Sequence, residues 1–143
     1  RWGRPETDRP IALDGRMLPH EWLRGPRGHL KVDALDHHDD HFFPGPRDIA
    51  WDLAGTCVEF GLDDSVASEL IGRYRRLSRD HTIEARLPAH ALAYLAFRTG
   101  YAAMSAESLR GSPDGERFRT LTEAYRSRLR GELARAGAAR WSA

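Results

Sequence analysis

Four carboxylates stand where the predicted backbone changes direction, and they are the residues of this chain best suited to chemistry. Asp14 follows a short apolar run, Glu21 begins a predicted strand, Asp36 ends the next strand, and Asp39 lies in the turn beyond it. Acid groups at the ends of buried strands are costly to place, so they usually serve chemistry or hold a nearby loop. Two adjacent carboxylates repel each other unless a cation or a proton lies between them, and Mg²⁺ prefers such oxygen ligands. The pattern predicts a divalent-cation site, with solvated strand ends as the open alternative.

A β-hairpin over about residues 20–36 would position these acids. Both arms alternate apolar and polar residues, and Gly25-Pro26-Arg27-Gly28 supplies the turn between them. Since a hairpin brings its two outer ends together, we expect Glu21 and Asp36 to lie side by side. A two-stranded hairpin is hardly stable alone, so we also expect it to pack on helices.

Everything from about residue 48 to residue 136 predicts helices. Apolar residues recur at helical spacing in stretches that begin at Asp48, at Ser65, after Pro88 and after Pro113. Asp48 is a natural N-cap, and Pro88 suits the first turn of a helix. The predicted fold class is therefore mainly α with a small β-hairpin (α+β).

The apolar stripes of these helices predict the core. In the second helix the expected inward residues include Val66 and Leu77, and in the third they include Tyr101 and Met104. Aromatic stripes at this spacing are typical of core faces rather than of cofactor sites. Residues 1–10 are rich in Pro and Arg without periodicity and predict coil.

Composition limits the classes of function. The 143 residues are enough for one domain with a modest core, and 22 Lys plus Arg balance 21 Asp plus Glu. No overall field therefore recruits nucleic acid or an anionic membrane, and no apolar run is long enough to span a bilayer. Because Cys57 is the only cysteine, no internal disulfide can form. We expect Cys57 to be a buried structural thiol. We expect a cytoplasmic protein without nucleic-acid or membrane partners.

The order of the motifs resembles the aminoglycoside phosphotransferase and choline kinase-like family, which has a protein kinase-like fold. In that family a catalytic Asp precedes a metal-binding Asn, a hairpin follows, and then come a second metal-binding Asp and a helix that begins Asp-x-x-x-Asp-Leu-Ala. Here Asp14 precedes the hairpin, Asp36 ends it, and the helix begins with Asp48 to Ala54, which reads Asp-Ile-Ala-Trp-Asp-Leu-Ala. The resemblance covers residues 11–54 by motif, whereas the later helices agree only in type and order.

The resemblance implies that residues 11–143 form a kinase-like C-terminal lobe. Asp14 would accept the proton of an attacking hydroxyl, and Asp36 would hold Mg²⁺ that bridges the nucleotide phosphates. Asp52 would be the buried helix acid that anchors the backbone of the catalytic loop. The implied reaction is ATP- and Mg²⁺-dependent phosphoryl transfer to a small-molecule hydroxyl, with nucleotide and acceptor as partners.

Several positions depart from the family pattern. Ala12 and Leu13 replace the His-Gly that precedes the catalytic Asp, and the chain contains no Asn. Glu21 is the best substitute for the missing Asn ligand, and Asp39 is a further candidate metal ligand. An N-terminal lobe with a phosphate-covering loop and a lysine is not recognisable, so we expect this chain to be a C-terminal fragment that is inactive alone. A catalytically inactive, kinase-like binding module is the alternative.

The run His37-His38-Asp39-Asp40-His41 supports a rival interpretation. Imidazole and carboxylate groups bind Zn²⁺, Mn²⁺ or iron, and a His-Asp pair is similar to that of HD-type phosphohydrolases. Those enzymes carry the pair on a helix, whereas here it falls in a predicted loop. His20, Asp80 or His81 would have to complete the ligand set, and a solvated polar turn is the simpler reading.

Overall fold

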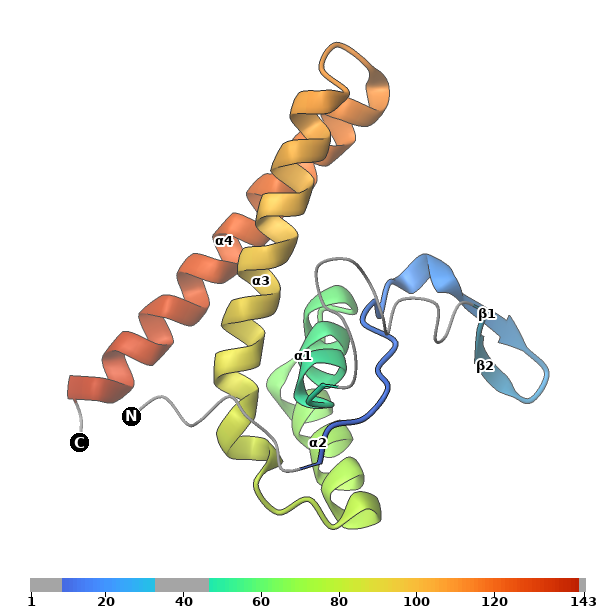
Figure 1. Ribbon diagram of the computed structural model, residues 1–143, viewed down its shortest axis with the longest axis vertical. Coiled ribbons are helices and arrows are strands. Elements are labelled where there is room, and N and C mark those ends of the chain that lie inside the picture. The colour runs from blue at the N-terminus through green and yellow to red at the C-terminus, as the bar shows by residue number, and fades with distance from the viewer. Residues whose placement is uncertain (1–8, 33–46, 142–143) are drawn as a thin grey trace. The chain divides into compact units, whose positions relative to one another are not determined.

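The computed structural model describes residues 9–32 and 47–141, with side chains described as far as residue 137 (Figure 1). These residues form one antiparallel pair of strands and four α-helices, so the predicted mainly helical α+β class is confirmed at that level. None of the described helices combines the length and the apolar character needed to cross a bilayer.

The chain divides into two compact units, residues 9–90 and residues 91–141 of the described parts, with the boundary inside the third helix. The elements, in chain order, are η1 (Pro19–Glu21), β1 (Trp22–Gly25), β2 (Gly28–Lys31), α1 (Ala50–Glu59), α2 (Asp64–Ser78), α3 (Ile83–Ser108) and α4 (Pro113–Trp141).

The hairpin of β1 and β2 turns at the predicted place. Gly25 pairs with Gly28, whose φ of 114° is accessible to glycine at little cost, and Leu23 pairs with Leu30. Beyond β2, the backbone N–H of Val32 donates to the carbonyl oxygen of Glu21 (3.0 Å), so pairing extends one step past the strands. The predicted neighbour of Glu21, Asp36, lies outside the described residues.

Trp22 joins the hairpin to the end of α1. Its ring meets that of Phe60 edge-on, with centroids 6.1 Å apart. Aromatic pairs prefer this geometry because the positive ring edge faces the negative ring face. The contact agrees with the expectation that the hairpin needs support from a helix.

The core of the unit 9–90 is built by α1, α2 and the first turns of α3. Its buried centre consists of Ala50, Leu53, Ile71 and Ile83, around which Ile49, Leu70, Tyr74 and Leu87 pack. Because these residues come from three helices, the core fixes α1 in place relative to α2 and to the start of α3.

The predicted start of α3 is wrong. The helix begins at Ile83, five residues before Pro88, which therefore lies inside it. Ile83 is fully buried, and the Arg86 side chain is held by two buried aspartates, so the turn ahead of Pro88 is stabilised by tertiary contacts. Inside a helix, a proline removes one backbone hydrogen bond and crowds the carbonyl group four residues earlier, a cost that these contacts can offset.

Part of the predicted apolar stripe is exposed in α2 and in α3. Val66 and Leu77 of α2, and Tyr101 and Met104 of α3, are exposed rather than buried. Ile71 occupies the buried face of α2 instead. Cys57, expected to be buried, is half-buried.

In the unit 91–141, α3 and α4 run antiparallel and side by side (Figure 1). Along α4 the inward residues Phe118, Thr122, Tyr125 and Leu129 are spaced four, three and four apart. This is the spacing of helices that pack along a shared seam. Arg98 of α3 crosses the seam and donates from Nε (3.3 Å) and Nη2 (3.2 Å) to the Tyr125 hydroxyl.

Candidate functional site

The loop that carries Asp14 runs along the start of α1. Ile11 and Arg47 exchange both backbone hydrogen bonds, each 2.8 Å long, in an isolated antiparallel bridge. Leu13, two residues after Ile11, is buried, and Asp14 is the next residue in the chain. The loop is therefore fixed at its first residue to the segment that enters α1.

Asp52 fixes the same loop at its other end. Its Oδ2 accepts the backbone N–H of Asp14 and its Oδ1 accepts the backbone N–H of Gly15, both at 3.0 Å. The indole Nε1 of Trp51 adds a bond to the Gly15 carbonyl oxygen (3.1 Å). Gly15 has a φ of 80°, a left-handed conformation that glycine adopts readily. This is the contact expected of an acid that anchors the Asp14 loop.

The carboxylate of Asp14 is directed at the only lysine of the chain. Nζ of Lys31 lies 2.6 Å from Oδ2 of Asp14 and 2.9 Å from Oε2 of Glu21. All three side chains are about nine-tenths buried. Oδ1 of Asp14 also accepts the backbone N–H of Arg16 (3.1 Å). The structure thus brings Asp14 and Glu21 to one ammonium group.

Burial sets the electrostatics of this cluster. Desolvation raises the pKa of Asp14 above its ordinary value, although the hydrogen bond from Lys31 opposes the shift. Desolvation also raises the pKa of Asp52, against the two backbone N–H bonds that favour its ionised form. For Lys31, burial disfavours the charged form, but the hydrogen bonds to Asp14 and Glu21 outweigh it and raise the pKa. Lys31 is therefore an ammonium group at neutral pH.

In the described part of the site, an ammonium group lies between two of the predicted metal ligands. The Lys31 ammonium already lies between the oxygens of Asp14 and Glu21, where the cation was expected. No group of three or more His, Cys, Asp or Glu side chains suited to a metal occurs among residues 9–32 and 47–137. Asp36 and Asp39, the other expected ligands, lie outside those ranges.

The rival transition-metal site falls mostly outside the described residues. His37, His38, Asp39 and His41 all belong to that undescribed stretch. Among the residues proposed to complete it, His20 and His81 are exposed, whereas Asp80 is buried and paired with Arg86. The three do not form a described cluster.

Sequence reasoning missed the role of two basic residues. No motif of the sequence pointed to Lys31, which lies on β2 opposite Trp22. Arg86 was not singled out, yet it binds both Asp48 and Asp80 in the core. The predicted N-cap Asp48 lies one residue too early, because Ile49 is the N-cap of α1; Oδ1 of Asp48 still accepts the Ala50 N–H (3.0 Å).

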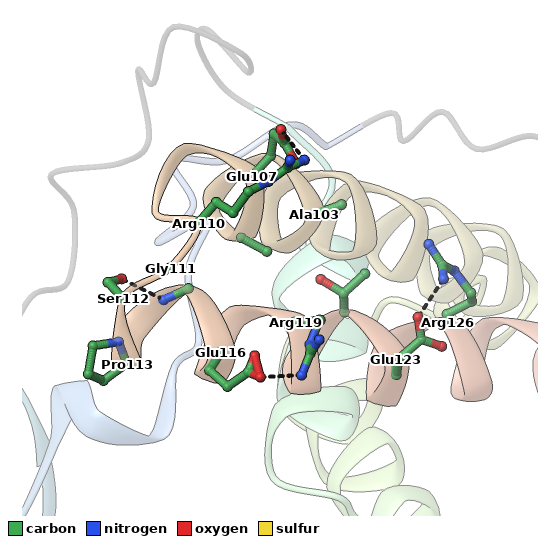
Figure 2. A pocket seen from close by; sticks show the side chains of 13 residues that line it. Ala103, Glu107, Arg110, Gly111, Ser112, Pro113, Glu116, Arg119, Glu123 and Arg126 are labelled. Carbon is green, nitrogen blue, oxygen red and sulfur yellow. Dashed lines mark hydrogen bonds and ion pairs between the residues drawn. The ribbon is translucent and has the colours of Figure 1, made fainter.

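A groove in the unit 91–141 is a second candidate. It encloses about 720 Å³ between the end of α3 and the start of α4 (Figure 2). Its three arginines each pair with a glutamate three residues earlier in the chain: Arg110 with Glu107, Arg119 with Glu116 and Arg126 with Glu123. Because each arginine is neutralised by its glutamate, these ion pairs do not provide an obvious reactive group in the groove.

Comparisons of the chain with protein-family models, with curated proteins and with solved structures find no match. The functional interpretation therefore depends on the geometry around Asp14. That cluster combines a buried carboxylate, a fixed backbone and a buried ammonium, whereas the ion pairs that line the groove of α3 and α4 are exposed.

Proposed function

We propose that this chain supplies the catalytic loop of a kinase-like phosphotransferase that transfers phosphoryl groups from ATP to a small-molecule hydroxyl. The observation that supports this function best is the double hydrogen bond from the Asp14 and Gly15 backbone to Asp52. A loop held in this way keeps one carboxylate in a fixed position, and positioning supplies much of the catalysis of phosphoryl transfer.

Asp14 would act as the proton acceptor for the attacking hydroxyl. Its backbone is held by Asp52, and the Arg16 N–H restricts its Oδ1. Burial raises its pKa, which makes the carboxylate a better base than an exposed aspartate. A general base of this kind typically contributes about 10²- to 10⁴-fold to the rate.

Lys31 would compensate negative charge beside Asp14. Its ammonium is paired at 2.6 Å with Asp14 and remains charged because its pKa is raised. A fixed cation next to the reacting oxygens stabilises charge that develops in transfer, without reorganisation at that moment. Glu21 holds the lysine from the opposite side at 2.9 Å.

ATP and Mg²⁺ are implied by the family resemblance rather than by these contacts. The metal would bring charge neutralisation to the nucleotide phosphates, and Asp36 is the expected ligand. The nucleotide-covering lobe that such enzymes require would come from another part of the complete protein.

A second candidate, a catalytically inactive kinase-like binding module, is favoured by one specific observation. The ammonium of Lys31 lies where the metal was expected, between Asp14 and Glu21. An ion pair in that place ties the loop to the hairpin without any need for a metal. The same contacts would then serve structure alone.

Turnover by the complete gene product distinguishes the phosphotransferase from the inactive binding module. ADP release would be followed with Mg²⁺-ATP and a panel of small alcohols that includes aminoglycosides and choline. We expect acceptor-dependent turnover that falls by about 10²-fold or more in Asp14→Asn, since the amide cannot take the proton. The matched control Asp64→Asn changes an exposed acid in the first turn of α2 and should keep the wild-type rate.

Two results would contradict phosphotransfer. Full activity in Asp14→Asn would remove Asp14 from the reaction. Absence of acceptor-dependent turnover with every alcohol would favour the inactive module instead.

A further inference from the structure

Arg86 forms the most densely bonded buried side-chain cluster described in the unit 9–90. Its guanidinium donates to Asp48 from Nε (2.6 Å) and Nη2 (3.2 Å), and to Asp80 from Nη2 (2.7 Å) and Nη1 (3.3 Å). Nη1 also bonds the hydroxyl of Thr82. The planar fork of arginine matches two carboxylates at once, which a lysine cannot do.

This cluster is buried among the helices that form the core. Arg86 is 6% exposed, Asp48 5% and Asp80 8%. Hydrogen bonds from Arg86 lower the pKa of Asp80 to about 2, so this carboxylate remains a charged partner of the guanidinium at neutral pH. Buried charges of this kind are costly unless every bond is made, and here the guanidinium meets three side chains.

Through Asp48, Arg86 reaches the start of α1. Asp48 accepts the Ala50 N–H at the first turn of the helix, and its neighbour Arg47 forms the backbone bridge to Ile11. Asp52 lies one helical turn further along α1, about 6 Å of axial rise, and carries the two bonds to the Asp14 loop. A shift of the helix start would therefore move both attachments of that loop together.

We propose, on the basis of the function proposed above, that Arg86 is a positioning residue for Asp14. It links Asp48, at the N-terminal end of α1, to Asp80, in the loop between α2 and α3. Helix α1 in turn determines the position of the Asp14 carboxylate. Arg86 touches neither Asp14 nor Asp52 in the contacts above, so its effect is transmitted by the helix. Misplacement of a reacting group by about 1 Å can lower a rate by about 10²-fold.

The test compares Arg86→Lys with Arg75→Lys in the complete gene product. Arg75 also joins α2 to α3, through Glu84 at 3.1 Å, but this pair is exposed. For Arg86→Lys we expect kcat to fall about 10- to 100-fold with the KM for ATP unchanged. Hydrogen exchange of the peptide 11–16 should become about tenfold faster, because its amides lose the protection given by Asp52.

Asp80→Asn is the milder second variant, since it retains the bonds between Arg86 and Asp48. It should change kcat and exchange in the same direction as Arg86→Lys, by a smaller factor, whereas Arg75→Lys should change neither. Wild-type exchange of the peptide 11–16 in both Arg86→Lys and Asp80→Asn would overturn the proposal. Equal acceleration of exchange in all helices would assign Arg86 to general stability and would also overturn it.

Failure of the proposed function gives a different result. The complete wild-type protein would then show no turnover, while exchange of the peptide 11–16 would still respond to Arg86→Lys. The bonds of Arg86 to Asp48 and Asp80 would then have a structural role only, and the proposed link to catalysis would be wrong.

Discussion

At the scale of single residues, Asp52 shows why a carboxylate differs from other small polar groups. Each of its two oxygens accepts one backbone N–H, from Asp14 and from Gly15, and the side chain is 7% exposed. An asparagine has the same shape but only one acceptor atom. The site therefore requires the acid for its two acceptors and not only for its charge.

Asp52→Asn should destabilise the protein. One backbone N–H of the Asp14 loop would face an amide NH₂ and lose its partner, at a cost of about 1–3 kcal/mol in the free energy of unfolding. Urea unfolding followed by circular dichroism measures the loss. The matched control is Asp63→Asn, at the N-cap of α2, where the side chain accepts only the Val66 N–H (2.9 Å). Asparagine caps helices as well as aspartate does, so equal losses in the two variants would contradict this account.

The sequence predicted part of this site and not the rest. The Asp-x-x-x-Asp-Leu-Ala motif resembles that of the kinase-like family, and this resemblance implied an anchoring role for Asp52. The bonds from the Asp14 and Gly15 backbone are consistent with that role. Which cation meets Asp14 was not predictable, since the Lys31 contact depends on how the hairpin lies on the loop. The place of Asp36 stays a prediction.

At the scale of elements, the turn between α3 and α4 depends on one close backbone approach. A Cβ built on Gly115 would lie 2.2 Å from the carbonyl oxygen of Leu109, far inside contact distance. Ser112 caps α4 by accepting the Gly115 N–H at its Oγ (3.0 Å), and Gly111 turns with a φ of 83°. The end of α3 and the start of α4 are thus packed backbone against backbone.

Gly115→Ala should destabilise the pair of helices, because the clash is with backbone atoms that cannot rotate away. We expect a loss of about 1–3 kcal/mol, as for other overpacked sites. Gly131→Ala is the matched control in α4, since nothing lies within 4 Å of a Cβ there. It should gain up to about 1 kcal/mol from helix propensity. Thermal unfolding monitored at the helical circular dichroism band measures both effects. A Gly115→Ala variant that is more stable than the wild type would contradict the expected clash.

Periodicity predicted the helices better than it predicted their buried faces. Periodicity indicates which residues share a face of a helix, but which face is buried depends on where the other helices pack. In α2 the expected residues Val66 and Leu77 are exposed, whereas Ile71 enters the core. The early start of α3 likewise depends on Arg86 and its distant partner Asp48, which no local window contains.

At the scale of the whole molecule, charge is balanced overall, so individual pairs determine the response to acid. The 22 basic and 21 acidic side chains almost cancel at neutral pH. The pKa of Asp80 falls from 3.8 to about 2, chiefly because Arg86 hydrogen-bonds it, whereas burial raises those of Asp14 and Asp52. A lowered pKa and a raised pKa change stability in opposite directions as pH falls.

Acid should remove the stability contributed by Asp80. That contribution is complete above pH 3.8, the unfolded value, and is lost as pH falls toward about 2, because the unfolded chain then binds the proton more tightly. Asp80→Asn has no such group, so the difference in unfolding free energy between the wild type and this variant should shrink over that interval. Urea unfolding at several pH values measures it. A difference that stays constant between pH 5 and the acid limit would contradict the assignment.

The ammonium between Asp14 and Glu21 has a practical consequence, because Lys31 is the only lysine in the chain. Acylating reagents therefore find one side-chain amine per polypeptide, and that amine is shielded and held in its unreactive protonated form. Its rate of acylation would report directly on whether the hairpin and the Asp14 loop are closed on each other. A covalent tag at this one position would then count open molecules in a mixed population.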